Sequence, residues 1–122
     1  MAETTGNVGI GTNAPDEKLT VKGTVHAQEV RVDLNGVLAP DYVFDDTYDL
    51  LSLSEVEEYI KVNNHLPEVP SAAEMEENGL NLKEMNLLLL KKVEELTLYV
   101  IELKKENIQM KKQITELKRT NE

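Results

Sequence analysis

Residues 82–117 read LKEMNLLLLKKVEELTLYVIELKKENIQMKKQITEL, and this stretch decides the fold. A seven-residue register fits it without interruption, and every d position is apolar. The d positions are Leu82, Leu89, Leu96, Leu103, Met110 and Leu117, and the a positions are Asn86, Val93, Val100, Asn107 and Ile114. Because neither Pro nor Gly follows Gly79, the pattern predicts a coiled coil over residues 81–122, with these eleven residues as its oligomerisation surface.

The number of strands in the coiled coil is not decided by the heptads alone. β-Branched residues at a over Leu at d, together with Asn at a, favour two strands. Met85 at g and Leu90 at e widen the apolar face, which favours three or more. Asn86 and Asn107 would cost stability in a buried seam, but they would fix a parallel register.

The two halves of this helix differ outside the a and d positions. From Met85 to Leu103 many further residues are apolar, whereas beyond Glu106 only Ile108 is. The first half is therefore expected to be covered, and the candidate cover is the helix predicted at residues 53–62 with its neighbouring aromatics, folded back as a collar. Charged residues outside the seam are expected to be solvated, so that changing Glu95 or Lys105 alters little.

Residues 41–80 are predicted to form this helical collar with a Pro-rich loop. Ser52 and Glu55 make a capping box, which predicts a helix from about residue 53 to residue 62. Ser71 and Glu74 make a second box, and the helix that it opens is expected to end at Asn78-Gly79.

Residues 1–40 are predicted to be a β-rich fibre segment, because their apolar residues alternate with polar ones. A phase change predicts a bulge or bend near residues 28–29, and Asn35-Gly36 predicts a turn. A sheet of so few short strands has only marginal stability by itself in water. We therefore expect the strands to be shared between chains. The alternating residues are Val8 and Ile10, Leu19 and Val21, Val25 and Ala27, and Val30, Val32 and Leu34.

Composition narrows the possible functions. The 122 residues carry a net charge of −10 and contain no cysteine, so disulfides and thiolate metal sites are absent. Residues 1–79 hold sixteen acidic against four basic residues, which disfavours nucleic-acid binding. No apolar run is long enough to cross a membrane, and Met1–Thr5 do not resemble the start of an export signal.

No arrangement of residues in the sequence predicts catalysis, a cofactor or a metal. The glycines of Gly6–Gly11 are followed by Pro15 and not by a helix, so they predict tight turns instead of a phosphate loop. His26 and His65 lack further ligands at metal-binding spacing. Asp45, Asp46 and Asp49 lack the remainder of a calcium loop, so we expect a non-enzymatic protein without cofactors.

Three motifs resemble the C-terminal module of phage tail-fibre-like proteins and large surface adhesins of Bacteroidetes. The first is GNVGIGT at residues 6–12 with KLTV at residues 18–21. The second combines DYVF at residues 41–44 with HLPEVPSA at residues 65–72, and the third is EELTLY at residues 94–99. Unlike self-cleaving endosialidase-type chaperone tips, this chain lacks a Ser-Asp cleavage junction, so a trimerising tip that stays attached is preferred.

The resemblance implies a fibrous α+β protein: a parallel homotrimer in which β-structure leads through a small helical collar into the coiled coil. The expected function is a structural, trimerising tip or adaptor of a phage tail fibre or related fibre, located on a virion or outside the cell. Its expected partners are its own copies, an upstream fibre or baseplate protein, and a host surface receptor. The alternative is an adhesin tip module that itself binds a glycan or protein receptor.

Overall fold

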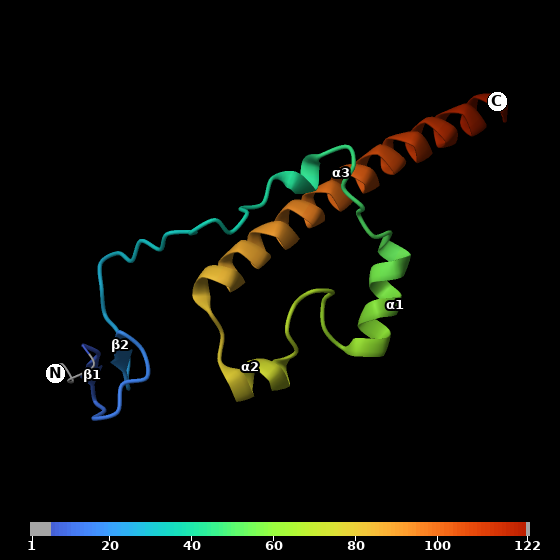
Figure 1. Cartoon of the computed structure of the whole chain (residues 1–122). Coiled ribbons are helices and arrows are strands. Elements are labelled where there is room, and N and C mark those ends of the chain that lie inside the picture. Colours follow the sequence, from blue (N-terminus) through green and yellow to red (C-terminus); the bar gives the residue numbers. More distant parts are fainter. Residues whose placement is uncertain (1–5, 122) are drawn as a thin grey trace. The chain divides into compact units, whose positions relative to one another are not determined.

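The computed structural model describes residues 6–121 (Figure 1). The chain has mixed α and β structure and forms two compact units that divide between Asp33 and Leu34. Each unit is described separately. The expectation about an export signal at Met1–Thr5 concerns residues outside the described range.

The first unit contains two short strands, β1 (Val8–Ile10) and β2 (Leu19–Val21), which pair in parallel. Both were predicted from the alternation of apolar residues. The Gly9 position is buried, and a side chain there would come within 2.5 Å of the Thr12 carbonyl oxygen. Glycine at this position thus permits a close chain contact, as the sequence indicated.

The loop between the two strands is organised by Thr20. Its hydroxyl accepts hydrogen bonds from the amides of Asp16 and Glu17 at 3.1 and 3.2 Å and donates to the Asp16 carboxylate at 2.9 Å. The bond from Thr20 lowers the pKa of Asp16. Because these contacts are local, the loop can connect parallel strands without the usual helical crossover.

The strands predicted at residues 25–27 and 30–34 are wrong for the single chain, because the described residues there form no sheet. Val25, Val30 and Val32 are more than half exposed. The chain does bend at Gln28, where the phase change predicted it, and Asn35-Gly36 form the predicted turn, closed by a 3.1 Å bond from the Val37 amide to the Leu34 carbonyl. A turn signal alone does not make a hairpin when the flanking residues lack a surface to cover.

In the second unit, the short 3₁₀ helix η1 (Tyr42–Phe44) is followed by α1 (Leu53–Asn63) and α2 (Ala72–Asn78). The capping box of α1 is complete: the Glu55 amide donates to the Ser52 hydroxyl and the Ser52 amide donates to the Glu55 carboxylate. At the start of α2 only one half of the predicted capping box forms, in which the Glu74 amide donates to the Ser71 hydroxyl. The helix ends at Gly79, as predicted. Helix starts are local in sequence, which is why both were predictable.

The last element is α3 (Leu82–Thr120), a single uninterrupted helix of 39 residues. At about 1.5 Å per residue it is roughly 60 Å long. It confirms the long helix expected at residues 81–122. Among the elements of this unit, η1 packs against α3, with η1 beside the middle of the long helix in Figure 1.

Candidate oligomerisation surface

The eleven a and d residues form the surface that we call the seam, and each of them is exposed in the single chain. Leu82, Leu96 and Leu117 expose 68, 60 and 62% of their surface. Leaving a continuous row of large apolar side chains in water is unfavourable by about 25 cal/mol per Å² of apolar surface. The described chain therefore leaves the seam uncovered, which makes it a candidate interface. Its members are Leu82, Asn86, Leu89, Val93, Leu96, Val100, Leu103, Asn107, Met110, Ile114 and Leu117.

The opposite face of the first half of α3 is covered by the chain itself. We call the covering segment, residues 40–51 together with Glu68, the clasp. Its most buried side chain is Val43 of η1, with 2% of its surface exposed, and Tyr99 of α3 is also buried. These two residues supply the small hydrophobic core of the described chain.

Two tyrosine hydroxyls fasten the clasp to α3. Tyr48 donates a 2.6 Å hydrogen bond to the Glu95 carboxylate, and Tyr99 donates one of the same length to the Leu51 carbonyl. Burial raises the pKa of both hydroxyls, and the Glu95 carboxylate raises that of Tyr48 further. The expectation that Glu95 can be changed without effect is therefore wrong, because its side chain is 12% exposed and bonded to the clasp.

Ion pairs tie the loop after α1 to the same face of α3. The Glu68 carboxylate lies 2.6 Å from Lys91 Nζ and 3.4 Å from Lys92 Nζ. Hydrogen bonding from Lys91 lowers the pKa of Glu68; burial opposes the charge of Lys91, but the Glu68 contact outweighs it and raises the pKa of Lys91. Lys91 also lies 5.6 Å from the centre of the Tyr42 ring, close enough for a cation–π contact.

One acidic residue under the clasp is not neutralised by any cation. Glu94 exposes 7% of its surface, and its Oε2 atom has no hydrogen-bond partner among the described residues. Burial raises the pKa of Glu94, and the neighbouring Asp41 carboxyl raises it further. Asp41 itself has a φ of 131°, a backbone conformation that is unfavourable for a residue with a side chain.

The predicted collar is partly wrong. The aromatic segment before α1 does cover α3, but α1 itself has no buried residue. Tyr59 packs edge-on against His65, 5.6 Å away between ring centres, and Phe44 is 52% exposed. Tyr99 is one of the apolar residues outside the seam that predicted cover of the first half, and it is buried under the clasp.

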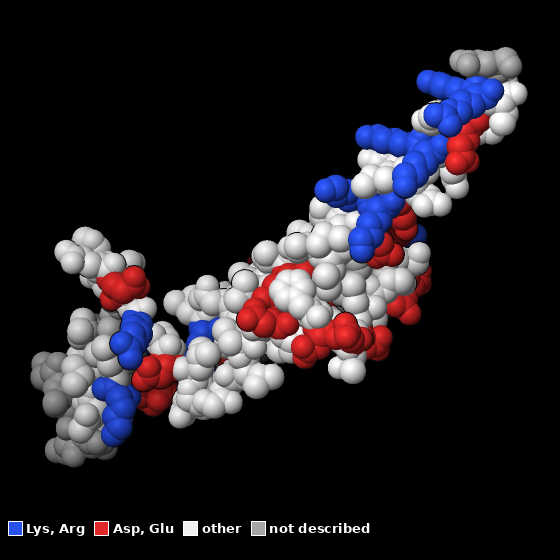
Figure 2. Space-filling model, turned by 90° about the horizontal axis from the view of Figure 1, so that it is seen from above, with Lys and Arg blue, Asp and Glu red and all other residues white. Residues whose placement is uncertain are grey.

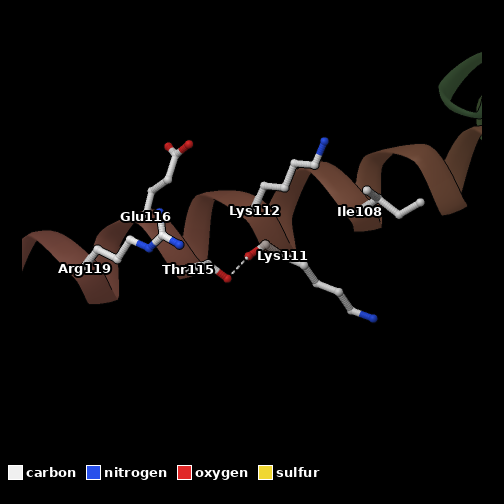
Figure 3. Close-up of a pocket in the computed structure, with 6 residues that line it drawn as sticks. All are labelled: Ile108, Lys111, Lys112, Thr115, Glu116 and Arg119. Atoms are coloured by element: carbon white, nitrogen blue, oxygen red, sulfur yellow. Dashed lines mark hydrogen bonds between the residues drawn. The ribbon is translucent and has the colours of Figure 1, made fainter.

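The second half of α3 has no cover at all, and every described residue from Val100 to Asn121 is exposed. Figure 2 shows lysine and arginine side chains following one another along this part of the helix. Figure 3 shows a hollow whose six lining residues, including Ile108 and Arg119, all come from α3. Because one helix supplies every wall, the hollow is an open face and not an enclosed ligand site.

The described residues form neither a metal site nor a membrane-spanning helix. No group of three or more His, Asp or Glu side chains there is arranged to hold a metal ion, and His26 is exposed. None of the described helices combines the length and the apolar character that spanning a membrane requires. No protein-family model, curated protein or solved structure matches the chain.

Proposed function

We propose that this chain is a non-enzymatic assembly element, the trimerising tip or adaptor of a phage tail fibre or related fibre. The observation that carries the proposal is the contrast between the two faces of α3. One face is sealed by the chain's own clasp, whereas the seam is left open over the whole helix. If the clasp served only to remove apolar side chains from water, it would be expected to cover the seam and not the opposite face of α3.

Three copies explain the open surface better than two. Leu90, at an e position beside the seam, is 46% exposed, so the bare apolar face is wider than the a and d rows. Wide faces of this kind suit three or more helices, because each helix then contacts two neighbours. The uncovered valines of residues 25–32 also require partners, which parallel copies would supply.

The charges that flank the seam support a parallel arrangement. In a parallel coiled coil the g residue of one chain lies beside the e residue five positions later in its neighbour. Glu106 at g would then meet Lys111 at e. In an antiparallel pair the e residues of the first half would face the e residues of the second half, which would place Lys83 opposite Lys118. Like charges placed opposite one another disfavour that arrangement.

The coiled coil is proposed to act first in assembly. Contacts along a helix are local, whereas strands from separate chains must find one another and gain little until the chains are aligned. Once the seam closes, the three copies of residues 6–34 are held at high effective concentration. The module then sets the register of a fibre whose upstream or baseplate partner joins at the β-rich end.

Two fragments test this order. Residues 72–122 should form a helical oligomer by circular dichroism and sedimentation, while residues 1–80 should be monomeric. If residues 1–80 formed a protease-resistant trimer unaided, the coiled coil would be a passive stalk and the proposal would fail.

The second candidate function is an adhesin tip, and the observation that favours it is the exposure of Phe44. An exposed aromatic ring can stack on a sugar. Reproducible binding of the intact oligomer to a glycan array, abolished by Phe44→Ala, would favour this alternative. Absence of binding would leave assembly as the function.

A further inference from the structure

The helix α1 presents an apolar stripe that its own chain leaves uncovered. Leu53 and Ile60 lie two turns apart and are 43 and 40% exposed. The helix has no buried residue, although its capping box and left-handed C-terminal residue Asn64 define it well. A helix of 11 residues without packing is marginal in water, so this stripe requires a partner surface.

The two flanks of the α3 seam differ in the clasped half. On the g flank, Tyr99 is buried and the Lys92 side chain is only 14% exposed, because the clasp covers both. On the e flank, Leu90 and Thr97 are exposed. Each chain therefore has one covered flank and one bare flank beside the same seam.

The connections of α1 place it on the covered flank. The chain reaches α1 directly after Leu51, whose carbonyl accepts the hydrogen bond from Tyr99 at g. After α1 the chain returns through Glu68, which pairs with Lys91 and with Lys92 at g. Both anchors of the α1 segment thus lie at or next to the g edge of α3.

We propose that α1 of each chain packs against the bare e flank of the neighbouring chain's α3 in the assembled oligomer. This inference rests on the parallel assembly proposed above, in which the g edge of one chain lies beside the e edge of the next. The covered flank of each copy then meets the bare flank of its neighbour around the ring. In an antiparallel pair the first half of each α3 would lie against the second half of its partner, so the covered g flank would not lie beside Leu90 and Thr97 of the neighbour.

Charge and polarity fit this partner. The helix α1 carries three glutamates against one lysine. The neighbour's flank continues from Leu90 and Thr97 to Lys104, which forms no ion pair among the described residues. An acidic helix with an apolar stripe would therefore lie against a flank that is apolar and then basic.

Cysteine cross-linking of the full-length chain tests the inference, because the native sequence has no cysteine. The variant Leu53→Cys/Thr97→Cys places one thiol at the start of α1 and the other on the e flank. Leu53 follows the anchor of Leu51 at the g edge, whereas Thr97 lies on the e flank, so packing of α1 on a neighbour predicts that a short bis-maleimide links two chains. The matched control, Leu53→Cys/Glu102→Cys, places the second thiol at a c position, on the same side of α3 as the g edge where Leu51 is anchored.

The expected result is that the Thr97 variant gives covalent dimers and trimers on a denaturing gel, while the control gives mainly closed monomers. Light scattering of the same samples before linking reports the assembly separately. An intact oligomer in which the Thr97 variant yields no interchain product would overturn the packing of α1 on a neighbour but not the proposed function. A mass of one chain would overturn both.

Discussion

The two halves of α3 share one heptad register but differ in what their own chain does for them. In the first half the clasp buries Tyr99 and Glu94, while in the second half every side chain is exposed. The seam is nevertheless equally bare in both halves. The seam is therefore not exposed because a covering segment is missing. The clasp is such a segment, and it packs on the opposite face of α3.

The comparison also separates two sources of helix stability. The first half gains from burial of Val43 and from hydrogen bonds to the clasp within one chain. The second half has neither, and an isolated helix of about 15–20 residues is marginal in water. In the proposed assembly neighbouring chains stabilise it, so the second half should depend on assembly more strongly than the first.

The largest expected effect comes from breaking the seam itself. Leu96→Asp would place a carboxylate from every chain in one layer, where each loses its hydration without gaining a partner. We expect dissociation and loss of helix in the second half, measured by sedimentation and circular dichroism. An unchanged mass and helix content for this variant would show that the heptad register is wrong.

A smaller effect is expected from loosening the clasp. Val43→Ala removes the most buried side chain and should lower the free energy of unfolding by about 1–3 kcal/mol. Hydrogen exchange should accelerate in residues 40–51 and in the first half of α3, with residues 104–120 little changed. Phe44→Ala is the matched control, because Phe44 is half exposed and should cost far less. Equal effects of the two variants would contradict the described cover.

The buried carboxyl under the clasp gives a pH-dependent effect. Because the folded state raises the pKa of Glu94, its stabilising contribution is present when the pH is below the unfolded-state pKa and is lost as the pH rises through the folded-state value. Glu94→Gln should therefore raise the melting temperature at neutral pH and leave it nearly unchanged in acid. A lower melting temperature at neutral pH together with an unchanged one in acid would contradict this, because it would mean that the ionised carboxylate stabilises the clasp.

The smallest effect is expected on the solvated side of the second half. Lys105 is exposed and forms no ion pair among the described residues, so Lys105→Ala should change the free energy of unfolding by less than about 0.5 kcal/mol. Chemical denaturation checks this value. A loss of several times that size would mean that Lys105 lies in an interface.

The features that could be predicted from sequence were those whose causes are local. The seam follows from a repeat of seven residues, and the α1 start follows from Ser52 and Glu55, three positions apart. The strands β1 and β2 follow from the local alternation of apolar residues, but their pairing with each other was not predicted, although the Thr20 hydroxyl bonds to Asp16 only four positions earlier.

The clasp could not be predicted in the same way. Tyr48 and Glu95 are 47 positions apart, and nothing in either neighbourhood specifies the other as partner. Sequence periodicity indicated that the first half of α3 is covered, and it assigned the cover to residues 53–62 with the neighbouring aromatics, of which only the aromatic segment packs on α3 in the single chain. The segment that covers α3 has one buried valine in a single 3₁₀ turn, which is too short to produce a periodic signal.

The most direct test of the central claim is the mass of the full-length chain in solution, measured by light scattering over a dilution series. Closure of the open seam by parallel copies predicts a mass of about three chains that persists on dilution. A mass of one chain at all concentrations would contradict it, because the exposed row from Leu82 to Leu117 would then be stable in water without a partner.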